Sequence, residues 1–235
     1  MEKLLTIYRQ QRQCLLKLIL DHQPVSRGRL RQLSGIRLRT IGRVAENLLQ
    51  EKLVQEHFQK KNRPGRRAGL LEIKPEGRFV LGVELTVHGL SGVLMNLLGE
   101  VVKSEEISFG AKAGREEILN SLKKLVTSLL SFSPEVCRAG LGFVDPGLVD
   151  FKQGVSLYST ILPSWKNVPI KKLLEETYHL PVVLSNSEQA KAMAERWFGQ
   201  ARGVDDFVFI EYGEGIACGI FARGQPGRGG QSIAG

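Results

Sequence analysis

The residue pattern changes near Phe79, and this change limits the chain to a fold with two dissimilar parts. Before Phe79, apolar residues recur at helical spacing and are interrupted by short Gly-, Pro- and Ser-bearing turns. After it, short apolar runs such as RFVLGVELT and GLSGVLMNL are typical of strands. A length of 235 residues is sufficient for two domains. We therefore expect a small helical domain followed by an α/β domain.

The positive charge is concentrated in the N-terminal third of the chain. Residues 1–80 carry 18 Lys and Arg against 7 Asp and Glu, whereas the remainder carries 15 basic and 17 acidic residues. The net charge of +9 therefore comes entirely from the first part. Basic charge confined to one domain indicates contact with nucleic acid, with a merely solvated basic face as the alternative.

The N-terminal pattern predicts three helices and a hairpin. The helices are expected over residues ~3–21, ~26–33 and ~37–51, with Ser26 capping the second and Gly35 bending the chain before the third. The segment KLVQEHFQKKNRPGRRAGLLEIKP then predicts two short strands around a basic tip. This order predicts a winged helix-turn-helix, whose third helix enters the DNA major groove. We expect this domain over residues 1–68, a linker over 69–75, and the α/β module over 76–235.

The candidate DNA-binding residues lie on the third helix and on the hairpin tip. Six arginines and no acidic residue occur between Arg27 and Arg43. Arginine can contact guanine through two hydrogen bonds, and an arginine segment stiffened by proline fits a narrow minor groove. For the tip, a flexible basic linker that contacts phosphates nonspecifically is the alternative. The expected readers of a double-stranded operator are Arg37, Arg39, Thr40 and Arg43 on the helix, and Arg63, Arg66 and Arg67 on the tip.

The α/β part places a polar pair where open sheets bind ligands. Three antiparallel strands are expected from Phe79, followed by a helix over residues ~115–131 and a strand ending at Asp145-Pro146-Gly147. A helix over ~168–179 leads to a strand over 181–185, and Asn186-Ser187 joins that strand to the next helix. Ligands bind at such strand-to-helix joints. The segment DFVFIEYGEGIACGIFARGQ repeats the first strand pair, so we expect a second lobe that a longer chain or another chain completes.

Other site classes have no signal in the sequence. No run of about 18 apolar residues could span a membrane, and the N-terminus lacks the order of a signal peptide. The three cysteines are far apart and no CxxC occurs, so neither a disulfide framework nor a metal site is expected. We expect a cytoplasmic protein.

Several segments together carry a resemblance. GIRLRTIGRVAENLLQEKLVQE, LGFVDPGLVD, LPSWKNVPIKKLLEETYHLPVVLSNSEQAKAMAERWFGQARG and EYGEGIACGIFARGQPGRGGQSIAG occur in order over nearly the whole chain. They resemble the ROK family (repressors, open reading frames and sugar kinases). The resemblance implies a winged helix joined to an actin-like, ribonuclease-H-like sugar-binding module, here with an incomplete second lobe. It also implies a homodimer or higher homo-oligomer.

The resemblance fails where kinase chemistry requires it. Kinases of the family carry an Asn-Asp pair whose Asp is the general base. Asn186 matches, but Ser187 replaces the Asp, and a serine hydroxyl cannot take a proton unaided at neutral pH. Glu188 is expected to point about 100° away from that position. We therefore expect no catalytic residue, and we expect sugar contacts from Asn186, Ser187 and Trp165, with core packing as the alternative for Trp165.

The phosphate-binding segments also differ from those of the family's kinases. Glu84-Leu85-Thr86 replaces an Asp-x-Gly-x-Thr loop, and Glu214 puts a negative charge in the second, Gly-rich loop. The family's Glu-x-Gly-His segment and zinc motif would follow Gly235, so no cofactor is expected. The sequence thus predicts a kinase-dead ROK-type regulator, most simply a repressor of carbohydrate-metabolism genes with a possible sugar effector. The alternatives are an ATP-dependent sugar kinase of the family and a DNA-binding repressor that no longer binds sugar.

Overall fold

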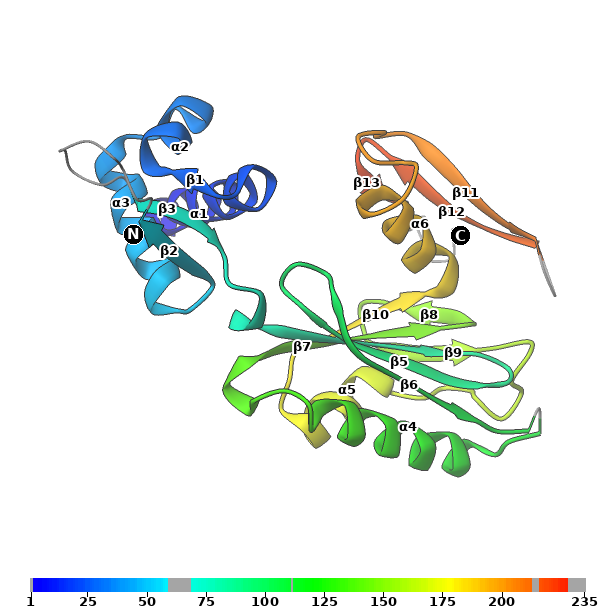
Figure 1. The fold of residues 1–235 in the computed structure, drawn as a ribbon. Helices are drawn as coiled ribbons and strands as arrows, with labels where there is room; N and C mark the ends of the chain where they lie inside the picture. Colours follow the sequence, from blue (N-terminus) through cyan, green and yellow to red (C-terminus); the bar gives the residue numbers. More distant parts are fainter. Residues whose placement is uncertain (1, 59–68, 111, 213–215, 228–235) are drawn as a thin grey trace. The chain divides into compact units, whose positions relative to one another are not determined.

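The computed structural model describes residues 2–58, 69–110, 112–212 and 216–227, and the chain forms two compact units (Figure 1). Unit 1 comprises Met1–Phe79 together with Asn96–Glu100. Unit 2 comprises Val80–Met95 and Val101–Gly235. The change of pattern near Phe79 therefore coincides with a structural boundary.

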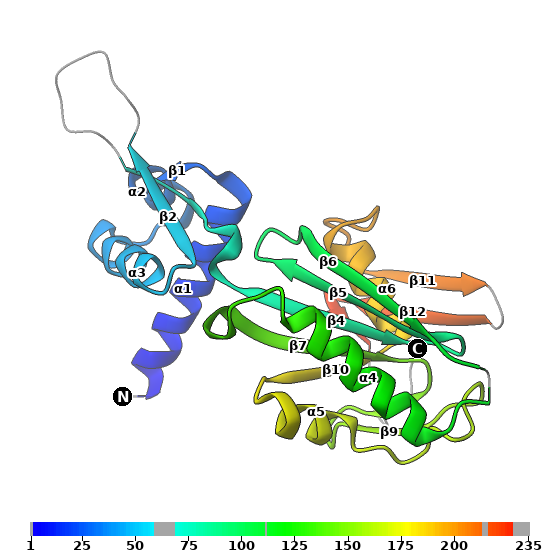
Figure 2. The ribbon, with the colours of Figure 1, turned by 60° about the horizontal axis from the view of Figure 1, so that its bottom comes forward.

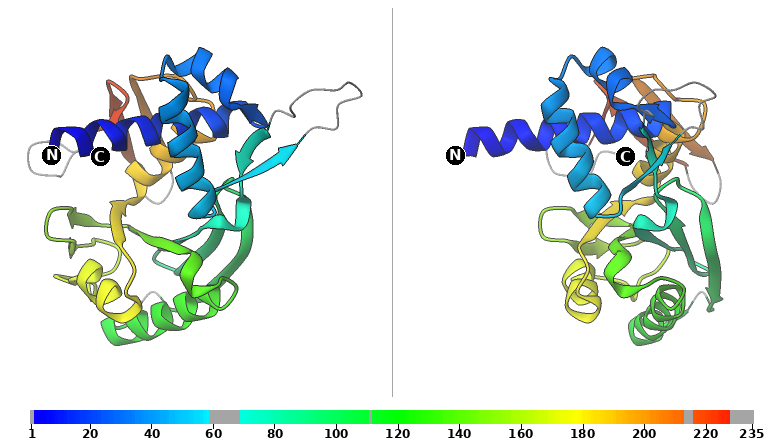
Figure 3. Two further views of the ribbon diagram at one scale, coloured as in Figure 1. Left: turned by 90° about the vertical axis from the view of Figure 1, so that its left-hand side faces the viewer. Right: turned by 60° about the vertical axis from the view of Figure 1, so that its left-hand side comes forward.

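The described residues of unit 1 form three helices and a small antiparallel sheet (Figure 3). The sheet has the strand order β1-β3-β2, and both pairings are antiparallel. The elements, in chain order, are α1 (Glu2–His22), β1 (Val25–Ser26), α2 (Arg27–Ser34), α3 (Leu38–Gln50), β2 (Val54–Phe58), β3 (Gly69–Ile73) and the 3-10 turn η1 (Pro75–Gly77).

Local sequence signals account for the helix boundaries of unit 1. The hydroxyl of Ser26 accepts a hydrogen bond from the backbone N–H of Arg29 at 3.2 Å, which caps α2. Gly35 ends α2 in the left-handed conformation, with φ of 68°, and donates its N–H to the carbonyl of Arg31. Apolar residues from all three helices then bury one core, which includes Leu15, Ile19, Leu30, Ile41, Val44 and Leu48.

Residues 69–75 are not the linker that the sequence predicted. Gly69–Ile73 form β3, which pairs with β2 along its whole length from Phe58↔Gly69 to Val54↔Ile73. Leu71 is 0% and Ile73 5% exposed, so both belong to the core of unit 1. The second of the two predicted strands is therefore present as β3, and the domain boundary at residue 68 was placed too early because it divides this strand from its partner β2.

Unit 2 is built on a mixed sheet with the strand order β10-β7-β4-β5-β6. β10 runs parallel to β7, and β6 runs antiparallel to β5. Two helices, α4 (Arg115–Leu130) and α5 (Ile170–Tyr178), lie on one face of the sheet (Figures 1 and 2). The strands are β4 (Phe79–Leu85), β5 (Gly89–Asn96), β6 (Val101–Ser108), β7 (Arg138–Asp145) and β10 (Val182–Asn186).

A second, smaller sheet in unit 2 carries α6 (Ser187–Trp197). Its strand order is β11-β12-β13, and β11 pairs antiparallel with β12 as the predicted repeat of a strand pair requires. A Cβ atom at Gly219 would lie 2.4 Å from the carbonyl oxygen of Glu188, so glycine permits α6 to approach β12 closely. The strands are β11 (Phe207–Tyr212), β12 (Ile216–Ala222) and β13 (Gln225–Pro226).

Three short elements of unit 2 have no counterpart in the sequence prediction. β8 (Leu148–Asp150) and β9 (Val155–Tyr158) form an antiparallel hairpin directly after β7. The 3-10 turn η2 (Glu135–Cys137) precedes β7. Strands this short carry too few residues for an alternating pattern to stand out.

Two kinds of site are not found among the described residues. None of the helices there is long and apolar enough to cross a membrane. Over the same ranges, no group of three or more His, Cys, Asp or Glu side chains could hold a metal ion.

Candidate functional sites

The exposed face of α3 gathers the helix residues that the sequence singled out. Arg37, Arg39 and Arg43 are exposed, and Thr40 is half-buried. The opposite face packs Ile41, Val44 and Leu48 into the core, so the arginines must point outward. Arg37 is the N-cap of α3 but makes no side-chain capping bond, and the first turn contains no acidic residue. This end of the helix therefore presents unopposed positive charge, which favours anions.

One of these arginines is held over an aromatic ring. The guanidinium carbon of Arg43 lies 5.2 Å from the centre of the Tyr8 ring on α1. The Tyr8 hydroxyl accepts a hydrogen bond from Asn47 Nδ2 at 2.6 Å, which fixes the ring against α3. A cation over a ring face is attracted by its quadrupole, so Arg43 is positioned before any ligand arrives. The sequence could not reveal this contact because the residues are 35 positions apart.

Not every arginine of the predicted basic surface is seen as an available charge. Arg27 on α2 forms an ion pair with Glu56 on β2, so one of the six arginines is neutralised from another element. The tip residues Arg63, Arg66 and Arg67 lie outside the described residues. The strands that flank them, β2 and β3, are both present.

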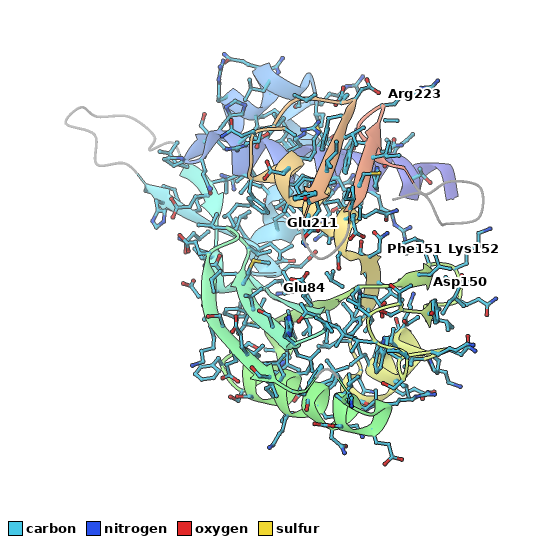
Figure 4. All side chains as sticks on the ribbon, turned by 90° about the vertical axis from the view of Figure 1, so that its right-hand side faces the viewer. Glu84, Asp150, Phe151, Lys152, Glu211 and Arg223 are labelled. Carbon is cyan, nitrogen blue, oxygen red and sulfur yellow. The ribbon has the colours of Figure 1, made fainter. Side chains whose placement is uncertain are left out.

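A cleft of about 440 Å³ opens in unit 2. The β4–β5 turn, the start of α6 and the strands β11 and β12 contribute to its lining. Glu84 approaches it from β4 and Glu211 from β11 (Figure 4). Pro146, next to the end of β7, also lines it. The cleft thus lies at the carboxyl ends of the parallel strands β7 and β10, where ligands of open sheets bind.

At the joint between β10 and α6, one of the two predicted sugar-binding residues has a structural role. The side-chain oxygen Oδ1 of Asn186 accepts a hydrogen bond from the backbone N–H of Gln189 at 3.0 Å, which caps α6. Ser187 lines the cleft, is 7% exposed, and lies with its Oγ 3.4 Å from the Asp145 carbonyl oxygen. Glu188 lines the cleft as well, although its position on α6 is turned about 100° from that of Ser187. A residue 100° further around a helix still borders a cleft that is wider than one side chain.

Two backbone N–H groups of the β4–β5 turn are already used within the turn. The backbone N–H of Thr86 bonds to the Gly89 carbonyl at 2.8 Å, and that of His88 bonds to Thr86 Oγ1 at 3.3 Å. Phosphate loops need several unused N–H groups that converge on one point. In the second loop, Gly213, Glu214 and Gly215 lie outside the described residues, whereas Ile216 and Ala217 line the cleft.

The described lining of the cleft is acidic. Glu84, Glu188 and Glu211 supply three carboxylates, whereas Lys191 is the single lysine or arginine among these lining residues. Lys191 Nζ lies 2.7 Å from Glu211 Oε1 and 2.6 Å from Oε2, so its charge is already matched. A polyphosphate entering this cleft would meet excess negative charge.

Trp165 is not among the residues that line the cleft. It is 0% exposed and packs beside Phe143, which corresponds to the core-packing alternative. Its indole N–H donates to Asp145 Oδ2 at 2.8 Å, and the backbone N–H of Gly147 donates to Oδ1 at 2.8 Å. Burial raises the pKa of the Asp145 carboxyl, and these hydrogen bonds oppose the rise. Asp145 therefore joins Trp165 to the turn that presents Pro146 to the cleft.

Known proteins match this chain over both units. The sequence model described as "ROK family" matches residues 80–235. A protein named xylose repressor from Caldicellulosiruptor bescii is 29% identical over 223 residues, which are 94% of this chain and 56% of that protein. The chain thus spans about half the length of the curated relatives it matches.

Two solved structures resemble the chain to different extents. A structure described as a ROK family transcriptional regulator, homolog of the E. coli MLC protein, has a TM-score of 0.80 and 25% identity, covering 97% of this chain and 58% of that one. A ROK family glucokinase from Streptomyces griseus, in complex with glucose and AMPPNP, has a TM-score of 0.59 and 24% identity, covering 66% of this chain and 48% of that one. The second likeness shows the fold alone, which is the actin-like fold of sugar kinases.

Proposed function

Because the chain belongs to the ROK family, we propose that it is a DNA-binding, sugar-responsive transcriptional repressor without kinase activity. Unit 1 is its winged helix-turn-helix, and unit 2 is its sugar-sensing and dimerising module. The observation that carries the proposal is the row of outward-facing arginines on α3, whose other face is fixed in the core. The regulator structure matches nearly the whole chain, whereas the glucokinase matches two thirds of it.

In this proposal α3 is the recognition helix. Arg37, Arg39, Thr40 and Arg43 face the base edges and phosphates of the major groove. Arg63, Arg66 and Arg67, on the segment between β2 and β3, reach the adjacent minor groove. A homodimer presents two such helices to half-sites one helical turn or a multiple apart.

The cleft of unit 2 is the proposed effector site. Its described lining combines carboxylates with the Ser187 hydroxyl, and such groups hydrogen-bond the hydroxyls of a neutral sugar. Asn186, at the same joint, is proposed to contribute through the part of its amide not used in capping. Sugar binding then shifts the population between forms that do and do not bind DNA. D-xylose is the first sugar to test because curated relatives are named xylose repressors.

A sugar kinase is the second candidate function, and one observation favours it. Glu188 borders the cleft next to Ser187, so a carboxylate is present near the place of the family's general base. The acidic lining and the bonded turn amides weigh against ATP. The Lys191–Glu211 pair, which leaves no unmatched cation among the described lining residues, weighs against it too.

Selection from a random duplex-DNA pool tests the proposal. We expect the full chain to enrich one sequence family, and D-xylose or another monosaccharide to change its affinity for that duplex. ADP release with ATP and the same sugars should stay well below about 1 s⁻¹, the low end of typical enzyme turnover. Turnover at or above that rate favours the kinase, and specific DNA binding that no sugar alters favours the repressor without an effector.

A further inference from the structure

Leu38 is an exposed apolar residue that stands between Arg37 and Arg39 at the start of α3. Its side chain is 48% exposed, and its neighbour Arg39 is exposed too. The buried residues of α3 lie further along the helix, at Ile41, Val44, Ala45 and Leu48. Leu38 therefore contributes little to the core of unit 1, although it stands at the end of the helix proposed to face DNA.

Gly42 lies one helical turn after Leu38, and nothing described in unit 1 requires a glycine there. A Cβ atom at Gly42 would meet no described heavy atom within 4 Å, and its φ is not positive. Two other glycines of the unit do have a structural cause: Gly35 has a φ of 68°, and a Cβ at Gly77 would lie 2.1 Å from the Lys52 carbonyl oxygen. Glycine inside a helix lowers its stability relative to alanine. The missing side chain at Gly42 is therefore explained best by a partner that approaches α3 closely.

Residues four apart lie side by side on a helix, so Leu38 forms an apolar wall beside the open position at Gly42. Arg39 and Arg43 are both exposed, and as the next residues after Leu38 and Gly42 they lie together on one side of this notch. A partner that fits must combine an apolar group of about the size of a methyl with strong negative charge around it. In the DNA major groove that combination is the C5-methyl of thymine, set between two lines of phosphates.

We propose that the notch formed by Leu38 and Gly42 receives the methyl group of a thymine and so specifies an A·T pair of the operator. This inference rests on the proposed function. Beyond the arginine contacts, it assigns a residue pair that recognises a base by apolar contact, without hydrogen bonds. Arg39 and Arg43 supply affinity from the adjoining surface of the helix, whereas Leu38 and Gly42 select one base pair.

Replacing thymines by deoxyuracil tests the notch directly, since it removes the methyl and leaves base pairing intact. The probe is the duplex selected by the full chain from the random pool, with its thymines replaced one at a time. At the contacted thymine we expect binding about fourfold weaker, equivalent to about 0.8 kcal/mol for one buried CH₂-sized group. With Leu38→Ala, the loss at this thymine should vanish. Leu20→Ala, at a leucine of α1 that is 44% exposed, should keep the wild-type profile.

Gly42→Ala gives a second, independent readout. Alanine is the better helix former, so the melting temperature of unit 1 should rise or stay unchanged, which excludes misfolding. Binding to the selected duplex should nevertheless weaken by about tenfold or more, and deoxyuracil at the contacted position should recover part of the affinity. The proposed thymine contact is contradicted if no thymine of the selected duplex shows a loss on replacement. It is also contradicted if the loss persists in Leu38→Ala. Either result leaves the DNA-binding proposal intact. Failure to enrich any sequence overturns both proposals.

Discussion

Lys191 and Glu211 form a close ion pair in the cleft of unit 2, with Lys191 Nζ 2.7 Å from Oε1 and 2.6 Å from Oε2 of Glu211. Both side chains are 37% exposed, so the pair is screened and adds little to folding stability. The pair matters because it makes the Lys191 charge less available to an anionic ligand. The lysine of the described lining is already matched, while Glu84 and Glu188 are left as additional acidic groups.

The first prediction concerns nucleotide affinity. Glu211→Gln should free Lys191 and remove one negative charge, which raises the affinity for AMPPNP by about fivefold for one charge at about 4 Å in water-like surroundings. Titration calorimetry on the full chain measures this change. Glu176→Gln, which breaks an exposed pair with Lys172 on α5, is the matched control and should leave affinity unchanged. Tight AMPPNP binding by the unaltered chain would contradict the account of the cleft.

The second prediction concerns the buried contact between Asp145 and Trp165. Asp145→Asn can accept only one of the two N–H groups that the carboxylate now accepts, from Trp165 and Gly147. The free energy of unfolding should fall by about 1–3 kcal/mol, the cost of a buried polar group without a partner. Denaturant titration with tryptophan fluorescence measures it. Asp150→Asn is the control, because the Asp150 side chain accepts from exposed Lys152 and Gln153 N–H groups that an amide oxygen can also serve.

The third prediction is a pH dependence with a defined sign. The folded-state pKa of Asp145 is raised by burial, so the folded chain holds this proton more tightly than the unfolded chain. Its contribution to stability is therefore greatest below the ordinary Asp pKa of about 3.9, and declines as pH rises through the folded-state value. The stability difference between the unaltered chain and Asp145→Asn, followed against pH, should show this decline. A difference that grows with pH across this window would contradict the burial argument.

The fourth prediction concerns the ring beneath Arg43. Tyr8→Leu removes the ring over which the guanidinium lies, so DNA binding should weaken about two- to fivefold, from about 0.5–1 kcal/mol. Tyr8→Phe keeps the ring and loses only the Asn47 hydrogen bond, so it should bind DNA almost as the unaltered chain does. Fluorescence anisotropy with the selected duplex measures both. Equal losses in the two variants would assign the effect to the hydrogen bond instead.

The fifth prediction concerns the tip between β2 and β3. Replacing Arg66 and Arg67 by alanine should weaken DNA binding, because fewer phosphates of the duplex are then neutralised. The slope of log affinity against log salt should become shallower by about 0.9 for each phosphate that the variant no longer neutralises. Anisotropy at several salt concentrations gives this slope. An unchanged slope would show that the tip does not contact phosphates.

The sequence was informative wherever the signal is local. Ser26 as a cap, Gly35 as a turn and the outward row from Arg37 to Arg43 depend on residues within one or two helical turns, and the structure has all of them. Contacts between distant elements carry no such signal. Glu56 neutralises Arg27, Tyr8 supports Arg43, and Asp145 holds Trp165, each across tens of residues. β3 was partly assigned to a linker for the same reason, since its partner is β2.

The central claim is that α3 reads a DNA sequence. The most direct measurement compares the affinity of the full chain for the selected duplex and for a shuffled duplex of equal length and composition, at about 0.15 M salt. The account predicts at least about 10³-fold tighter binding to the selected duplex, as specific recognition typically gives, and loss of most of that ratio in Arg39→Ala. Equal affinity for the two duplexes would contradict it, because charge alone would then explain the binding.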